Sequence, residues 1–169
     1  MILGMSVAMF TTIHVMLSLI GIVAGFIALI GMIRGKLLEL WATTFLLTTV
    51  LTSLTGFPIP PLGLDPPRIV GIISLVLLAV AIAALYFFSP SGRSRWLYVV
   101  TSTAALYLNC FVGVVQSFQK IPFIHALAPT QAEPPFAIAQ IAVLAIFIFL
   151  GVLAVRNFHP KPTLAAVNP

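Results

Sequence analysis

The feature that most constrains this chain is a series of long apolar blocks that contain no charged residue. Five can be marked, at residues 7–33, 40–57, 69–88, 96–118 and 136–155. A bilayer core is about 30 Å thick, so about 18 or more such residues predict a helix that crosses it. Only 7% of the residues are charged and 61% are hydrophobic, unlike a water-soluble domain. We therefore predict a single membrane domain over residues 1–169, an all-α bundle of five transmembrane helices in a lipid bilayer.

The prolines lie between these blocks. All thirteen fall outside them, which suits helices in lipid because proline lacks a backbone N–H and disrupts internal hydrogen bonding. The first block lacks the positively charged start of a secretion signal, and it exceeds the roughly 7 to 15 apolar residues that such a signal contains. We interpret it as a retained spanning helix.

The distribution of lysine and arginine predicts an orientation. At one side of the predicted bundle lie Arg34, Lys36, Arg93, Arg95, Arg156 and Lys161. The other side has only Arg68 and Lys120. Because cytoplasmic connections are enriched in positive charge, the N-terminus is predicted outside and the C-terminus in the cytoplasm. The formal net charge of +5 comes from these short connections rather than from one folded face, so no nucleic-acid partner is expected.

Uncharged polar residues inside the blocks indicate where a site would lie. A rise of about 1.5 Å per residue places them roughly 18 to 30 Å from the basic side, in the outer half of the bundle. Residues three, four or seven apart share a helix face, so several of them form seams that can face one another. We predict a ligand pocket from His14, Ser18, Thr52, Thr55, Asn109, Gln116 and Gln140. The connection at residues 119–135 would roof it.

Helix packing is the alternative interpretation of the same residues. Gly21 and Gly25 form a GxxxG contact pattern, and the threonines at positions 44, 48, 52 and 55 form a stripe that can bond back to its own helix. Small and hydroxyl residues are common at membrane helix interfaces. A buried histidine, asparagine or glutamine is costlier in lipid and more often functional.

The leading functional prediction is a non-enzymatic membrane subunit or binding module, with other membrane subunits as candidate partners. A second hypothesis is a redox protein that binds haem or quinone through His14 and His125, since axial histidines hold haem and His159 lies on the opposite side. A small-solute channel or facilitator is a third. The blocks contain no carboxylate, which argues against a proton-coupled pump.

No catalytic or metal-ligating motif stands out. The one cysteine, Cys110, lies inside an apolar block, so there is no disulfide and no metal-type cysteine pair. Ser117 or Thr130 could be combined with His125 and Glu133 as a hydrolytic triad, but their spacing is not diagnostic. No catalytic residue and no metal site are therefore assigned.

Two stretches carry a resemblance: TGFPIPPLGLDPPRIVGIISLVLLAV and ALYLNCFVGVVQSFQKIPFIHALAPTQAEPPF. They resemble segments of a group of small, uncharacterised bacterial inner-membrane proteins, over nearly the whole chain. The resemblance implies the bacterial cytoplasmic membrane as the location. It implies no activity and no functional residue.

Overall fold

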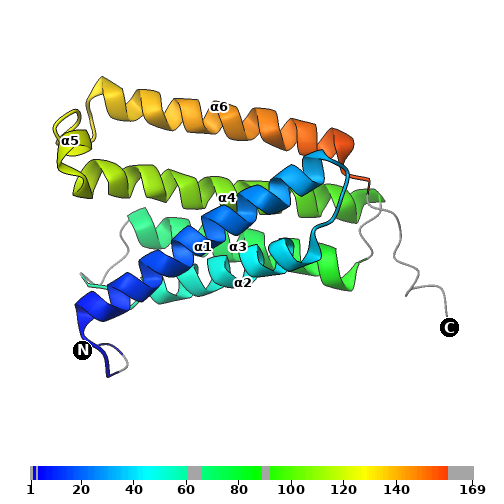
Figure 1. The fold of residues 1–169 in the computed structure, drawn as a ribbon, viewed down its shortest axis with the longest axis horizontal. Helices are drawn as coiled ribbons and strands as arrows, with labels where there is room; N and C mark the ends of the chain where they lie inside the picture. The colour runs from blue at the N-terminus through cyan, green and yellow to red at the C-terminus, as the bar shows by residue number, and fades with distance from the viewer. Residues whose placement is uncertain (1, 3, 61–65, 89–91, 160–169) are drawn as a thin grey trace.

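The computed structural model describes residues 2, 4–60, 66–88 and 92–159, and in these ranges the chain is helical with no strand (Figure 1). The elements are α1 (Val7–Ile33), α2 (Glu39–Gly56), α3 (Pro66–Ile82), the π-helical turn η1 (Ala83–Phe87), α4 (Gly92–Lys120), α5 (Pro122–His125) and α6 (Pro134–Asn157). The predicted all-α class is confirmed.

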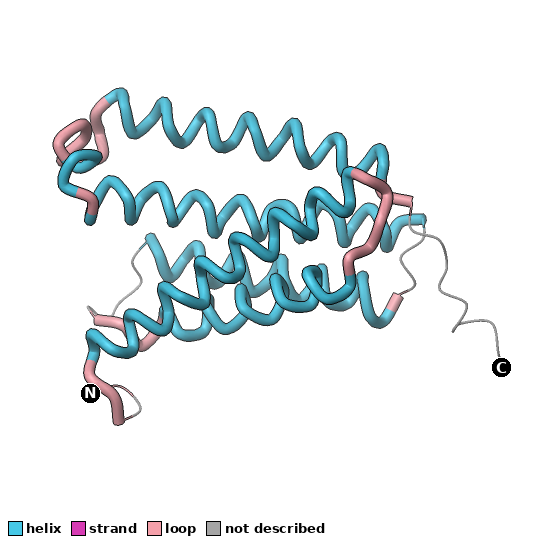
Figure 2. The backbone as a smooth tube through the Cα atoms, in the orientation of Figure 1, coloured by secondary structure: helices cyan, strands magenta, loops and turns pink. Residues whose placement is uncertain are grey.

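The five long helices lie lengthwise beside one another, and the connections gather at two ends (Figure 2). One end, which we call the basic end, holds Arg34, Lys36, Arg93, Arg95 and Arg156. The other, which we call the α5 end, holds α5, the start of α1, the end of α2 and the start of α3 (Figure 1). Helix α4 is central, because it contacts α1, α2, α3, η1, α5 and α6.

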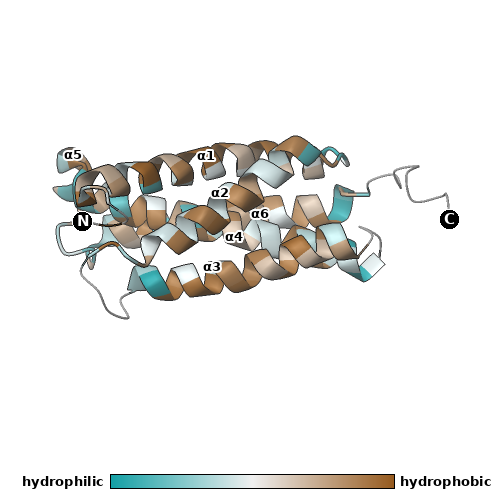
Figure 3. Cartoon of the chain, turned by 90° about the horizontal axis from the view of Figure 1, so that it is seen from below, coloured by the Kyte–Doolittle hydropathy of each residue, from teal (hydrophilic) through white to brown (hydrophobic). Residues whose placement is uncertain are grey.

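Four helices are long and apolar enough to cross a membrane: α1, α3 with η1, α4 and α6. Their flanks are largely hydrophobic, and hydrophilic residues concentrate near the two ends (Figure 3). The chain thus has the character of a multi-pass membrane protein. The fifth predicted block forms α2, which has 18 residues and is richer in threonine than the other four.

Several helices begin earlier than their apolar blocks. Helices α3 and α6 start at Pro66 and Pro134, because proline at the first helical positions gives up an N–H that has no partner within the helix. The block at 69–88 was predicted as one regular helix, yet it ends in the π-helical turn. There the Ser94 hydroxyl donates to the carbonyls of Ala84, at 2.7 Å, and Phe88, at 3.2 Å.

The turn between α1 and α2 is a Schellman motif. Gly35 has φ +72°, and its N–H donates to the carbonyl of Met32, while the Lys36 N–H donates to that of Gly31. A Cβ at Gly35 would lie 3.2 Å from the carbonyl oxygen of Asn157. The turn therefore lies against the end of α6, and the first and last long helices meet at the basic end.

Arg95 of α4 fixes the last turn of α6. Its guanidinium donates to the carbonyl of Val155, at 3.0 Å, and to that of Phe158. These carbonyls lie at the helix end, where the helix itself supplies no donor. One of the arginines used to predict orientation thus also caps a helix.

Glycines allow α1 to approach its neighbours closely. A Cβ at Gly25 would lie 2.5 Å from Leu106 Cδ1 and 2.8 Å from Phe45 Cδ2. Leu106 and Phe45 are buried core residues of α4 and α2. The glycine pattern in α1 is therefore a packing contact, as the alternative interpretation predicted.

Candidate functional site

A cavity of about 590 Å³ lies between α1, α2, α3 and α4, towards the α5 end. Its size is within the range of small-molecule sites, which is roughly 300 to 1,000 Å³. Helix α6 contributes nothing to its lining. The described residues that line it include many polar side chains but no aspartate or glutamate.

The cavity brings together five of the predicted pocket residues: His14, Ser18, Thr52, Asn109 and Gln116. Thr55 is not part of the lining, but its Oγ1 lies 2.9 Å from Nδ1 of His14. Gln140 lies elsewhere, since its Nε2 donates to the Phe111 carbonyl of α4 at 3.3 Å. It joins α6 to α4 and does not reach the cavity.

Asn109 is held in place from α2. Its Nδ2 donates to Thr49 Oγ1 at 3.2 Å, and the residue is 9% exposed. A Cβ at Gly21 would lie 3.1 Å from Thr49 Oγ1 and 3.6 Å from Asn109 Nδ2. The glycine therefore lets α1 close over this hydrogen bond, and the asparagine forms a fixed wall of the cavity.

The threonine stripe of α2 behaves in two ways. Thr44, Thr48 and Thr55 donate to the carbonyls of Leu40, Thr44 and Leu51 at 2.7 to 2.8 Å, as the packing interpretation predicted. Thr52 has the same spacing but does not. It lines the cavity, is 7% exposed, and its hydroxyl has no hydrogen-bond partner among the described residues. A buried hydroxyl without a partner costs about 1 to 3 kcal/mol, so Thr52 is a candidate ligand contact.

Two cationic residues lie where the cavity reaches the α5 end. Arg68 lines it and is 8% exposed, and its guanidinium donates to the carbonyls of Phe57 and Ile59 at the end of α2. Lys120 also lines it, at the exposed end of α4. Two basic side chains thus line the cavity near the α5 end, and the rest of its described polar lining consists of hydroxyl, amide and imidazole groups.

Thr49, Arg68 and Ser74 are among the residues of this region that the sequence reasoning missed. Thr49 was overlooked because it lies off the predicted stripe. Arg68 was interpreted only as a connection charge, although a helix beginning at Pro66 brings it into the bundle. Ser74 lines the cavity and is 4% exposed, and it is the one serine or threonine of block 69–88. A lone hydroxyl in an apolar block was the available signal.

His125 does not line the cavity that contains His14. Its Nδ1 lies 2.9 Å from the Phe118 carbonyl oxygen. Ser117, in turn, donates to the carbonyl of Gly113 at 2.8 Å. The histidine pair of the haem hypothesis therefore does not share this cavity. Of the hydrolytic triad, Thr130 and Glu133 bond to each other, but no hydrogen bond joins either of them, or Ser117, to His125.

The connection between α4 and α6 folds against those two helices. Gln131 donates to the Val115 carbonyl at 3.0 Å, and the rings of Phe118 and Phe136 meet edge to face with centroids 5.4 Å apart. Of the predicted roof, residues 119–121 line the cavity and residues 122–135 do not. The predicted roof is thus wrong for most of its length, because these contacts hold the segment to α4 and α6.

Glu133 is bonded locally just before α6. Its Oε1 accepts from the Thr130 hydroxyl at 2.9 Å and from the Thr130 N–H at 3.2 Å. Partial loss of hydration raises the pKa of the carboxyl, but these hydrogen bonds outweigh that effect and hold the pKa below its usual value. The carboxylate stabilises the turn and does not take part in the cavity.

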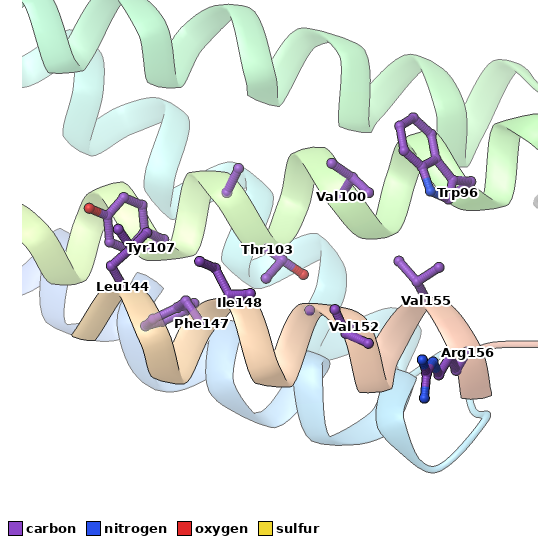
Figure 4. A pocket seen from close by; sticks show the side chains of 12 residues that line it. Trp96, Val100, Thr103, Tyr107, Leu144, Phe147, Ile148, Val152, Val155 and Arg156 are labelled. Atoms are coloured by element: carbon purple, nitrogen blue, oxygen red, sulfur yellow. The ribbon is translucent and has the colours of Figure 1, made fainter. Parts of the chain in front are cut away.

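A second hollow of about 470 Å³ runs between α4 and α6 (Figure 4). Its lining is mainly aliphatic and aromatic, with Trp96 and Arg156 at the basic end. Thr103 is its one buried hydroxyl without a partner among the described residues. The groove lacks the converging polar groups of the cavity, so it is the weaker candidate.

Within the described ranges, no group of three or more histidine, cysteine or acidic residues could hold a metal ion. Comparisons with known protein families, curated proteins and solved structures give no match to this chain. The resemblance to bacterial inner-membrane proteins accordingly stays a prediction, and the case for a function comes from the cavity.

Proposed function

We propose that this chain is a five-span membrane protein that binds a small molecule in the cavity between α1, α2, α3 and α4, without catalysing a reaction on it. It would act alone or as the binding subunit of a larger membrane complex. The proposed location is the bacterial cytoplasmic membrane, with the N-terminus outside.

The position of α2 supports five spans. Helix α1 ends at the basic end, and α3 begins at the α5 end, so α2 connects the two ends (Figure 1). At about 1.5 Å per residue its 18 residues cover about 27 Å, close to the thickness of the bilayer core. Its lower hydropathy has a structural cause, because Thr48, Thr49 and Thr52 are buried inside the bundle rather than facing lipid.

The charges support the orientation. The basic end has five lysines and arginines among the described residues, at positions 34, 36, 93, 95 and 156, against two at the α5 end, Arg68 and Lys120. The positive-inside rule assigns the richer end to the cytoplasm. The cavity then opens on the outer side.

The observation that carries the binding proposal is the Thr52 hydroxyl. Three threonines of the same stripe bond back to their own helix, and the one that lines the cavity does not. Around it, Ser18 and Ser74 also make no hydrogen bond to a described residue, although each lines the cavity. Hydroxyls on three helices thus converge on one space, as expected where a bound molecule completes their hydrogen bonds.

A cavity-filling variant tests the proposal. A Cβ at Gly113 meets no atom within 4 Å, although Gly113 lines the cavity. Gly113→Leu therefore places a side chain in the space without displacing a neighbour near its Cβ. Ala142→Leu, on the exposed face of α6, adds the same volume outside the cavity and is the control.

The probe is a trifluoromethyl-diazirinyl phenol, photolysed with the protein in nanodiscs, and adducts are mapped by mass spectrometry. We expect adducts on the cavity residues of α1 and α4 in the wild type and in Ala142→Leu, and at least a fivefold lower yield there in Gly113→Leu. Equal yields at these residues in all three proteins would contradict binding in the cavity.

A further inference from the structure

The hydrogen bond between His14 and Thr55 determines which chemistry the imidazole presents to the cavity. His14 Nδ1 and Thr55 Oγ1 lie 2.9 Å apart. Either atom could be the donor if the pair stood alone, because a neutral imidazole has one N–H and one acceptor nitrogen. The other bonds of Thr55 decide between the two arrangements.

Thr55 has a single hydroxyl hydrogen, and the helix uses it. Its Oγ1 donates to the Leu51 carbonyl at 2.7 Å, and the Thr52 carbonyl lies 3.2 Å from the same oxygen. Thr55 therefore meets His14 with an oxygen lone pair. It follows that Nδ1 of His14 carries the hydrogen and donates.

The neutral ring then has its lone pair on Nε2. The described lining of the cavity contains no carboxylate that could pair with an imidazolium, while Lys120 places positive charge at its exposed end. A charged ring inside a membrane segment would be costly without such a partner. Since Nδ1 is the nitrogen that contacts Thr55, and His14 lines the cavity, Nε2 is the nitrogen that the ring offers to a bound molecule.

We propose that the cavity selects a molecule that donates a hydrogen bond to Nε2 of His14, with a neutral hydroxyl group, such as that of a phenol or an alcohol. This inference rests on the proposed binding function and specifies its ligand class. Ser18, Thr52 and Ser74 discriminate less between donor and acceptor groups of the bound molecule, because a hydroxyl can either donate or accept. A carbonyl or ether oxygen meets a second acceptor at Nε2 and forms no bond there. His14 is the specificity-determining residue, and Thr55 is the residue that positions its proton.

Two photoreactive probes that differ in one group test this inference. The first is the trifluoromethyl-diazirinyl phenol, and the second is its methyl ether, which keeps the ring but has no donor. Both are applied at equal concentration in the nanodisc membrane. We expect the phenol to label the cavity residues about threefold to tenfold more than the ether, the range of one net hydrogen bond.

Variants of Thr55 separate the role of the proton from the shape of the cavity. Thr55→Val removes the acceptor that holds the hydrogen on Nδ1, so the ratio of phenol to ether labelling should fall towards one. Thr55→Ser keeps the hydroxyl and should retain the wild-type ratio. Thr44→Val is the matched control, since Thr44 makes the same back-bond, to Leu40 at 2.8 Å, away from the histidine. The thermal midpoint of each variant checks that the fold is intact.

Each result is decisive. Equal labelling by phenol and ether, with both blocked by Gly113→Leu, overturns the donor requirement and leaves the binding proposal standing. A phenol preference that survives in Thr55→Val also overturns the inference, because it would not depend on the tautomer of His14. Labelling that no cavity variant affects overturns the binding proposal itself, and the inference with it.

Discussion

At the scale of single residues, the role of each polar side chain depends on its hydrogen-bond partner. Thr44 and Thr48 satisfy their hydroxyls within their own helix, Thr49 accepts from Asn109, and Thr52 is left for the cavity. The sequence predicted His14, Asn109 and Thr52 together, because polar groups in lipid are rare and share a depth, and all three line the cavity. It was not enough to find Thr49, since adjacent threonines differ only in which neighbour each faces.

The hydrogen bond between Asn109 and Thr49 is expected to stabilise the fold modestly. We predict a coupling of about 0.6 kcal/mol, and no more than about 1.7 kcal/mol, between Asn109→Ala and Thr49→Val, the range found for such bonds between membrane helices. The measurement is a double-mutant cycle on the free energy of unfolding. The pair Asn109→Ala and Thr44→Val is the control and should be additive to within about 0.5 kcal/mol. Additive effects for the first pair would show that the bond does not contribute.

At the scale of helices, the same residue type has opposite roles in α1 and α4. Gly25 is needed because Leu106 and Phe45 occupy the space where its Cβ would lie, whereas Gly113 faces the cavity. The GxxxG pattern predicted the first role. Nothing in the sequence indicated the second role. An isolated glycine in an apolar block has the same pattern whether it contacts a neighbouring helix or lines a cavity.

Alanine substitutions at these two glycines should therefore change the free energy of unfolding differently. Gly25→Ala should lower the free energy of unfolding by about 1 to 3 kcal/mol through overpacking. Gly113→Ala should leave it unchanged or raise it by up to about 1 kcal/mol, since alanine is the better helix former. Unfolding in mixed micelles measures both. A Gly25→Ala variant as stable as the wild type would show that α1 can move away from α2 and α4 at little cost.

Arg95 is expected to hold the last turn of α6 in place. In Arg95→Ala the carbonyls of Val155 and Phe158 lose their donor, so backbone amides near residues 154–158 should exchange hydrogen at least fivefold faster, for about 1 kcal/mol or more of lost local stability. Hydrogen exchange read by mass spectrometry detects this. Arg93→Ala, at an exposed neighbour that makes no side-chain bond to a described residue, should leave the exchange unchanged. Equal acceleration in both variants would point to general charge effects.

At the scale of the whole molecule, the apolar blocks predicted the helices well, because length and the absence of charge are strong signals in lipid. Helix ends were less predictable: prolines were expected to precede α3 and α6, and they form their first turns instead. The sequence also gave no indication that residues 122–135 fold against α4 and α6. Those contacts depend on which backbone carbonyls of α4 the side chains of Gln131 and His125 meet, 16 and 7 residues earlier in the chain.

The topology can be tested with single cysteines in a Cys110→Ser background. Lys36→Cys precedes α2 and Pro60→Cys follows it, so five spans predict that the two lie on opposite sides of the membrane. A membrane-impermeant maleimide should label Pro60→Cys in intact cells, and Lys36→Cys only after the membrane is permeabilised. Labelling of both on the same side would remove α2 from the spans. The reverse pattern would keep five spans and invert the orientation.

The order of the helices along the chain also has a consequence for how the protein is made. Among the described residues, those that line the cavity all lie between Thr11 and Ile121, and α6 packs outside it against α1 and α4. A ribosome that has released the chain as far as Ile121 has therefore already supplied all of this described lining, while α6 is still in the exit tunnel. The contact of Gly35 with Asn157 then forms only after α6 has left the ribosome. In biogenesis, α6 packs against the outside of a pocket that is already built.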